Sequence, residues 1–411
     1  MKTFRNFVKN LNSMEQLWKL FYRLIAETDL TFKRYLYDQI DWRDRLIIIK
    51  GAKGVGKSTL ICQHIKEHFG DSIDKALYVS LDHIWFTNHS ILDMAEYHYA
   101  HGGTHLFLDE VHKYHNWQQE VKNIYDYYPK LHIVVTGSSM LRIDSLAKVD
   151  LSRRHVAYTL DGLSFREFLI MEGYADLGTY QLDDILQRHG YIASTIAADI
   201  KVLPLFERYL KEGYYPFYKE SPSTFAIKLQ QAIINVIEAD IPAVSEIEYE
   251  SIYKIKQLLS ILSQQSPYTL NITQICRELS VSRNTLVRLI DLLDTASIIR
   301  RLYPTLTGLK QLTKPEKLLF DNTNIMYAFA QAANDGTMRE TFASSQLSHS
   351  HSLTMPTKGD LLVDQRHLFE IGGKGKGFKQ IKDINDSYVL AADIEIGAGN
   401  KIPLWLLGLL Y

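Results

Sequence analysis

The feature that most constrains the fold is a glycine-rich loop between two apolar segments. The run RLIIIKGAKGVGKSTLICQHI begins at residue 45, and its residues 51–58 satisfy the pattern G-x-x-x-x-G-K-S. The continuous apolar run Leu46–Ile49, which is mostly β-branched, predicts a short buried parallel strand, and a helix is predicted to begin at Ser58. The glycines let backbone N–H groups turn towards an anion, and the N-terminal end of a helix favours negative charge. This order predicts a phosphate-binding loop (P-loop) rather than a glycine-rich turn that binds nothing.

A P-loop assigns separate roles to its residues. The backbone amides contact the α- and β-phosphates of a nucleoside triphosphate, Lys57 contacts the β- and γ-phosphates, and the Ser58 hydroxyl takes a magnesium site. We therefore expect ATP and Mg²⁺ as ligands. The predicted binding residues are Gly51, Ala52, Lys53, Gly54, Val55, Gly56, Lys57, Ser58 and Thr59.

A second strand ends in two acids. In GTHLFLDEVHKYHNW, the apolar residues Leu106–Leu108 precede Asp109 and Glu110. The carboxyl ends of strands in open α/β sheets carry the ligand site. We expect Asp109 to hold magnesium, directly or through water, and Glu110 to orient and polarise the attacking water. The alternative is an ordinary acidic helix cap after a strand.

Two further strands complete the predicted sheet. LHIVVTGSSM ends in small polar residues, of which Ser138 is a candidate sensor of the γ-phosphate or an ordinary turn residue. KALYVSLD, residues 75–82, forms another strand. Four strands with helical segments between them predict an α/β fold, a parallel sheet wrapped by helices.

Length, charge and cysteine content set broader bounds. A chain of 411 residues suggests roughly two to three domains, and its net charge of -1 argues against a strongly basic nucleic-acid binder. The 2 cysteines are far apart, so neither a disulfide framework nor a thiolate zinc site is expected. No signal-peptide pattern and no apolar run long enough to span a membrane occur. We expect a cytoplasmic protein without a membrane partner.

The order of these segments resembles a widespread prokaryotic family of AAA-type P-loop ATPases. In that family the acidic strand is followed by a tryptophan, as Trp117 follows here, and the sensor strand ends in Gly-Ser, as at Gly137 and Ser138. The phrase LSFREFL, residues 163–169, also matches. The resemblance covers almost the whole chain. It implies a winged helix after the ATPase and a C-terminal domain of unknown function related to the restriction-endonuclease fold, PD-(D/E)XK.

The rest of the chain divides into three predicted parts after the ATPase domain. Apolar residues at helical spacing follow Leu169, and NITQICRELSVSRNTLVRLIDLL predicts a helix-turn-helix with Ser282 as an N-cap. DNA reading would place Arg283, Asn284 and Arg288 near a major groove, although winged helices also dock proteins. The predicted parts are a P-loop ATPase domain (1–171), a helical lid or connector (172–267), a winged helix (268–310) and a small nuclease-like α/β domain (311–411).

The C-terminal part departs from the nuclease pattern. Enzymes of that fold place an acid at one strand end and Glu-x-Lys on the next strand, so that two carboxylates bind metal and a lysine assists the attacking water. Here Gly372 stands where the lysine belongs. The candidate set is Glu340, Asp360 or Asp364, Glu370, and Lys374 as a replacement lysine.

AAA-type ATPases commonly use an arginine from a neighbouring subunit to stabilise charge on the γ-phosphate. Arg154 lies where the resembling family carries such an arginine, with Arg153 as the alternative, so a homo-oligomer is a candidate state. We predict a magnesium-dependent ATPase whose nucleotide state drives interaction with DNA or a protein. The alternatives are an ATP-gated DNA nuclease and a nucleotide-dependent scaffold that does not hydrolyse ATP.

Overall fold

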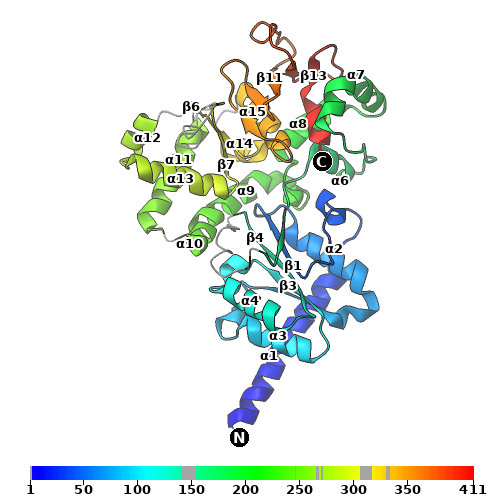
Figure 1. Cartoon of the computed structure of the whole chain (residues 1–411), viewed down its shortest axis with the longest axis vertical. Helices are drawn as coiled ribbons and strands as arrows, with labels where there is room; N and C mark the ends of the chain where they lie inside the picture. The colour runs from blue at the N-terminus through cyan, green and yellow to red at the C-terminus, as the bar shows by residue number, and fades with distance from the viewer. Residues whose placement is uncertain are drawn as a thin grey trace. The chain divides into compact units, whose positions relative to one another are not determined.

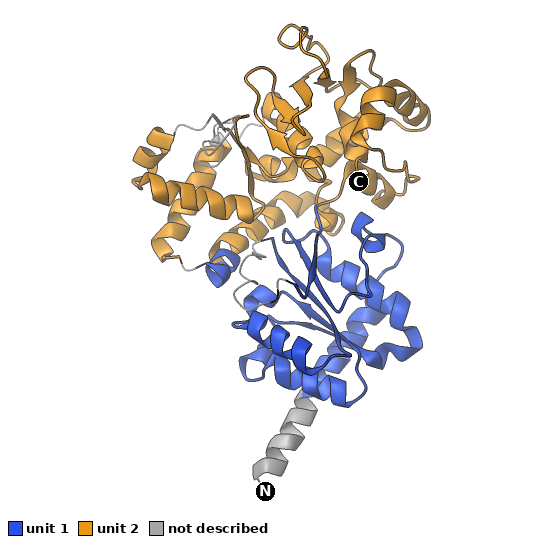
Figure 2. Ribbon diagram, in the orientation of Figure 1, with its two compact units in different colours: residues 1–161, 239–246 blue, residues 162–238, 247–411 orange. Residues whose placement is uncertain are grey.

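The computed structural model describes residues 2–139, 151, 153–245, 247–264, 268–269, 272–305, 317–329 and 334–411. The chain forms two compact units (Figure 2): the first comprises residues 1–161 and 239–246, and the second comprises residues 162–238 and 247–411. The predicted boundaries at 267 and 310 lie outside the described residues.

The first boundary differs from the prediction at residue 171. The segment after 161 belongs to the second unit because its helix α6 (Phe165–Met171) packs against the C-terminal 3-10 helix η9 (Leu404–Leu409). Ser164 caps α6 and also donates a hydrogen bond from Oγ to the Tyr411 carbonyl oxygen at 2.7 Å. Contacts with the far end of the chain therefore decide where this segment folds.

The first unit contains a five-stranded parallel sheet, which confirms the predicted fold class (Figure 1). The strand order is β2-β3-β4-β1-β5, so β4 separates the P-loop strand β1 from the acidic strand β3. Four of these strands were predicted from apolar runs, and β5 corresponds to the strand that the family resemblance places from His155 onwards. The strand bounds are β1 Leu46–Gly51, β2 Ala76–Ser80, β3 His105–Asp109, β4 His132–Ser138 and β5 Val156–Thr159.

Helices flank this sheet. The helix after the P-loop, α2, packs against β1, β2 and α1, while α3 packs against α4. Strands β1, β3 and β4 are almost completely buried, as expected for a parallel sheet covered on both faces. The bounds are α1 Lys2–Glu27, α2 Lys57–Phe69, α3 Ile91–Ala100, α4 Trp117–Tyr127 and α10 Ile241–Val244.

The second unit begins with helices and continues through a small three-stranded antiparallel sheet with the order β6-β8-β7. Helices α11, α12 and α13 pack against one another, and α13 packs against β7. The helix bounds are α7 Leu182–Asp199, α8 Val202–Glu212, α9 Phe225–Asn235, α11 Tyr249–Gln264, α12 Ile272–Leu279, α13 Arg283–Thr295, α14 Thr323–Phe329 and α15 Asp335–Leu347.

The C-terminal part of the second unit is a mixed five-stranded sheet with the order β13-β12-β11-β10-β9. Strands β11, β12 and β13 are parallel, whereas β9 and β10 are antiparallel additions. The strand bounds of this unit are β6 Tyr268–Thr269, β7 Ile299–Leu302, β8 Lys317–Phe320, β9 Leu353–Thr354, β10 Leu361–Val363, β11 His367–Gly372, β12 Ser387–Ala391 and β13 Lys401–Pro403.

A search of the described helices finds none with the length and apolar character needed to cross a membrane.

Candidate nucleotide-binding and catalytic site

The P-loop joins β1 to α2 as the sequence predicts. Gly54 and Gly56 adopt left-handed backbone conformations, with φ of 85° and 100°, which glycine takes without a steric penalty. Gly51 is constrained differently, because a Cβ atom there would lie 2.3 Å from the Leu160 carbonyl oxygen. These glycines let the loop turn into α2, whose first residue is Lys57.

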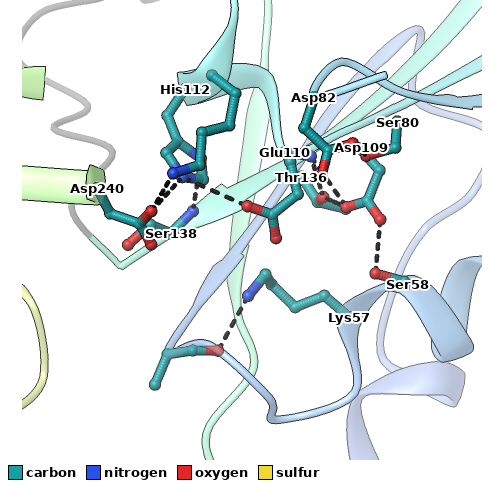
Figure 3. A network of polar contacts seen from close by, with 12 residues as sticks. Lys57, Ser58, Ser80, Asp82, Asp109, Glu110, His112, Thr136, Ser138 and Asp240 are labelled. Carbon is teal, nitrogen blue, oxygen red and sulfur yellow. Dashed lines mark hydrogen bonds and ion pairs between the residues drawn. The ribbon is translucent and has the colours of Figure 1, made fainter. Parts of the chain in front are cut away.

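Lys57 is buried and folds back over its own loop. Its Nζ donates to the carbonyl oxygens of Gly51 and Ala52, both at 2.9 Å. Burial lowers the pKa of Lys57, while the nearby charges of Glu110 and Asp109 act in the opposite direction. The lysine is therefore placed at the loop and within the field of both predicted acids (Figure 3).

Asp109 lies at the end of β3 and accepts hydrogen bonds from side chains on α2, β2 and β4. Oδ2 accepts from Ser58 Oγ and from Tyr78 Oη, each at 2.5 Å, and Oδ1 accepts from Thr136 Oγ1. The side chain is almost fully buried. Burial and the Asp109 charge together raise the pKa of Tyr78, so that hydroxyl remains a donor.

Ser58 and Asp109 fit the predicted magnesium site by their chemistry. Both offer oxygen, the donor that Mg²⁺ prefers, and they lie in direct contact. In the part of the chain that the structure describes, no group of three or more His, Cys, Asp or Glu side chains is arranged for a metal ion. A magnesium ion here would therefore rest on one or two protein oxygens together with phosphate and water oxygens, as is usual for this ion.

Glu110 follows β3 in a left-handed conformation with φ of 53°, which is uncommon for a residue with a side chain. Its backbone N–H donates to Asp109 Oδ1 at 3.0 Å and to Thr136 Oγ1 at 3.3 Å. Its carboxylate Oε2 lies 3.3 Å from His112 Nε2. The contacts hold Glu110 at the carboxyl end of the sheet, where the prediction placed it.

Ser138 ends β4, where it is paired in register with Gly51 of the P-loop strand. Its backbone N–H donates to His112 Nδ1 at 3.4 Å. The predicted sensor residue therefore lies at the same edge of the sheet as the P-loop and the two acids. Its contact with a γ-phosphate stays a prediction.

The sequence did not predict the contacts that five residues of this region make: Arg34, Tyr78, His112, Thr136 and Asp240. Thr136 had a sequence signal, because it lies near the end of a predicted strand. Tyr78 belongs to the neighbouring strand, and His112 lies in the short 3-10 helix η4 (Val111–Lys113). Arg34 and Asp240 carry no local signal, because the first precedes β1 and contacts the Val55 carbonyl oxygen, while the second comes from a distant part of the chain.

The arginine candidates lie in the same unit. Arg154 precedes β5, and its Nε is 3.3 Å from Asp126 Oδ1 on α4 of its own chain. Both Arg153 and Arg154 also make other interactions. The predicted role of Arg154 as a finger would require it to exchange the Asp126 contact for a phosphate of another copy.

Of the nuclease-like candidates, Glu370 lies on β11 of the C-terminal sheet and Glu340 lies on α15, and the lysine beside Glu370 is not the predicted one. Glu370 of β11 is buried and forms an ion pair with Lys376, not with the predicted Lys374. A Cβ atom on Gly372 would lie 2.7 Å from the Cβ of Lys376, so the Lys376 side chain occupies the space beside this glycine. Lys374 was predicted because side chains on a strand alternate between its faces, so that residues 372 and 374 would share one face. The chain instead leaves β11 at Gly372 and turns, which brings Lys376 back over the strand.

The remaining acids of that set have protein partners. Glu340 of α15 forms an ion pair with Lys317, and burial raises the pKa of Glu340 despite this charge. Asp360 accepts the backbone N–H of Ile371 at 2.7 Å. Asp364 instead contacts His351 at 2.6 Å.

The predicted DNA-contacting residues lie at the start of α13, which Ser282 caps as predicted. The residues Arg283, Asn284 and Arg288 are exposed. The neighbouring basic residues of β7 are engaged internally: Arg300 pairs with Asp321 at 2.7 Å, and Arg301 pairs with Asp294 at 2.7 Å. The basic excess available to a partner is therefore smaller than the sequence count suggested.

The parallel sheet, the P-loop and the acidic strand end together define a P-loop fold of the kind found in nucleotide-binding proteins. Residues 43–169 match the family model described as an AAA domain. Residues 203–336 match a second model, described as a domain of unknown function, DUF8612.

The chain is also similar to individual proteins. An uncharacterized protein of Methanocaldococcus jannaschii, MJ1637, is 25% identical over 331 residues, which cover 72% of this chain and 68% of that protein. AMPPCP-bound DnaA of Aquifex aeolicus is 13% identical with a TM-score of 0.26, covering 67% of this chain and 87% of that one. The Hsp104–ADP complex of S. cerevisiae is 14% identical with a TM-score of 0.31, covering 67% of this chain and 40% of that one.

Proposed function

We propose that this protein hydrolyses ATP to ADP and phosphate and uses its nucleotide state to drive an interaction with DNA or a protein. The observation that carries the proposal is the common location of Lys57, Asp109 and Glu110 at the carboxyl ends of β1 and β3. Both acids act electrostatically on Lys57, so the three groups occupy one site.

Each group has a chemical task in this proposal. The P-loop amides and Lys57 bind the phosphates, and Glu110 accepts a proton from the water that attacks the γ-phosphorus. A bond forms between the water oxygen and phosphorus, the bond to the β-phosphate oxygen breaks, and ADP leaves. A magnesium ion held through Ser58 and Asp109 would supply charge neutralisation for the phosphate oxygens when bound.

Two variants test this function. We expect Lys57→Ala to abolish ATP binding, because it removes the cation of the loop. We expect Glu110→Gln to bind ATP with unchanged affinity and to lose about 10²-fold or more in turnover, the usual contribution of a general base. Affinity is measured by titration with a fluorescent ATP analogue, and turnover by phosphate release. Unchanged turnover in Glu110→Gln would remove Glu110 from the reaction and favour the non-hydrolysing scaffold.

Helices α11, α12 and α13 and the three-stranded sheet β6-β8-β7 support a winged helix. They do not decide whether its partner is DNA or a protein. Exposed Arg283, Asn284 and Arg288 favour DNA, whereas the internal pairing of Arg300 and Arg301 favours a protein. Duplex DNA titrated against Glu110→Gln protein with ATP, with and without Arg283→Ala and Arg288→Ala, separates the two. Binding that does not change with these alanines would favour a protein partner.

The ATP-gated nuclease is the weaker alternative. Its candidate carboxylates Glu370 and Glu340 each have a lysine partner, Lys376 and Lys317. These ion pairs support a structural role for the cluster.

A further inference from the structure

His112 lies between two carboxylates of the first unit. Its ring is fully buried, and Nε2 is 3.3 Å from Glu110 Oε2 and 3.6 Å from Asp240 Oδ1 (Figure 3). The other ring nitrogen, Nδ1, accepts the backbone N–H of Ser138. An acceptor at Nδ1 places the hydrogen of a neutral imidazole on Nε2. Nε2 is the ring nitrogen that lies near both carboxylates, and among the described residues it makes no hydrogen bond to either one, so either carboxylate can accept its hydrogen after a small shift.

Asp240 lies in a short segment that returns to the first unit from the second. It is the last residue of the π-helix Val236–Asp240, a rare form that is frequently found at functional sites. Residues 239–246 belong to the first unit, while the chain on either side belongs to the second unit. Helix α10, which follows Asp240, packs against η4, the short helix that carries His112.

Asp240 is nearly fully buried and ionised. Burial by itself raises its pKa, but the neighbouring side chains of His112 and Lys113 outweigh burial and lower the pKa to about 2. Lys113 forms an ion pair with Oδ1. The second oxygen, Oδ2, has no hydrogen-bond partner among the described residues. A buried carboxylate in this state competes strongly for any donor within reach.

We propose that His112 and Asp240 are positioning residues for Glu110, and that residues 239–246 thereby set the rate of ATP hydrolysis. This inference rests on the proposed function of Glu110. When His112 gives its Nε2 hydrogen to Asp240, the Glu110 carboxylate is not held by the imidazole and can turn towards the attacking water. When Asp240 withdraws, His112 donates to Glu110 and holds that carboxylate away from the water. Because the flanking chain is part of the second unit, an event there reaches Glu110 through Asp240.

If Asp240 and Glu110 compete for the Nε2 hydrogen of His112, variants of these residues should behave differently from variants that only disturb packing. We expect Asp240→Asn to lower kcat about tenfold, because a neutral amide competes less well for His112, while the KM and affinity for ATP stay unchanged. The double variant Asp240→Asn with His112→Ala should turn over faster than Asp240→Asn alone, because the residue that holds Glu110 is gone. Two independent structural defects would instead make the double variant slower.

Lys113→Met provides an independent test of the proposal in case Asp240→Asn folds poorly. Lys113→Met removes the competing partner of Asp240, so kcat should be equal to or above that of the wild type. Glu67→Gln is the matched control, since it neutralises another ion-paired carboxylate of the first unit, 2.6 Å from Lys33. Its kcat should not change.

The outcomes separate the two proposals. If the wild type shows no turnover, or Glu110→Gln retains full turnover, both the ATPase function and this inference fall. If those two behave as expected, only the inference is overturned by an unchanged kcat in Asp240→Asn, by a double variant slower than the single one, or by a loss of kcat in Lys113→Met.

Discussion

At the scale of the residue, Glu370 shows how a missing side chain is replaced from elsewhere. Its buried carboxylate has Lys376 on one oxygen and no hydrogen-bond partner, among the described residues, on the other. Gly372 leaves the space that the Lys376 side chain fills. A buried carboxylate with a single cationic partner is sensitive to the loss of that partner, because the remaining charge is left without compensation.

We therefore expect Lys376→Met to reduce the free energy of unfolding by about 2–3 kcal/mol. Breaking a fully buried ion pair costs roughly 3–5 kcal/mol, and the value here is smaller because the Lys376 side chain is 31% exposed. The measurement is chemical denaturation, with Lys374→Met as the matched control that should change little. Adding Glu370→Gln to Lys376→Met should recover stability, since it removes the uncompensated charge.

The same residues address the nuclease alternative. Glu370 is paired with Lys376, and Glu340 is paired with Lys317. We therefore expect no Mg²⁺- or Mn²⁺-dependent cleavage of plasmid or linear DNA above that of Glu370→Ala. Cleavage that disappears in both Glu370→Ala and Lys376→Met would instead make Lys376 the lysine of an active nuclease site.

At the scale of the element, helix α2 carries a buried histidine in a stack of rings. His64 lies 3.6 Å from Trp42 between ring centroids, with the planes 9° apart, and 4.3 Å from His68 on the next turn. Burial, and then repulsion from His68 and His105, lowers the pKa of His64 to about 3. The helix that follows the P-loop is thus anchored farther along by a neutral imidazole.

This anchor predicts a loss of stability in mild acid. The folded-state pKa lies below the unfolded value of about 6.5, so the unfolded state binds more protons as the pH falls through 6.5. Between pH 7 and pH 5, His64 alone should remove about 2 kcal/mol from the free energy of unfolding. Denaturant titrations across this range, compared with His64→Phe, provide the measurement. Parallel curves for the two proteins would show that His64 does not titrate on unfolding.

At the scale of the whole molecule, the two units are joined by three crossings of the chain, at residues 161–162, 238–239 and 246–247. The crossings near 240 carry a segment of the first unit between two helical parts of the second. The proposed function requires such a connection, since nucleotide chemistry in one part would have to alter another.

Assembly is tested by Arg154. If it acts in trans, specific ATPase activity should rise with protein concentration, because an arginine finger contributes about 10³-fold or more in related systems. Mixing Arg154→Ala with Glu110→Gln should then restore some turnover, since one copy supplies the finger and the other supplies the active site. Activity independent of concentration, with full turnover in Arg154→Ala and in Arg153→Ala, would mean that ATP hydrolysis uses neither arginine as a finger.

The sequence by itself determined the parts of the site that are contiguous in the chain. The P-loop from Gly51 to Thr59 and the pair Asp109 and Glu110 were predicted correctly as a loop and a strand end, because strand, turn and helix signals are local. The parallel sheet followed from the alternation of these segments.

Only the tertiary structure decided which distant residues meet these parts. Strand register places Tyr78 and Thr136 on Asp109, and a returning segment places Asp240 beside His112. Likewise, the turn after β11 selects Lys376 over Lys374. None of these contacts leaves a periodic or spacing signal, because they depend on how separate elements pack, and packing is set by the whole folded chain rather than by any short stretch of it.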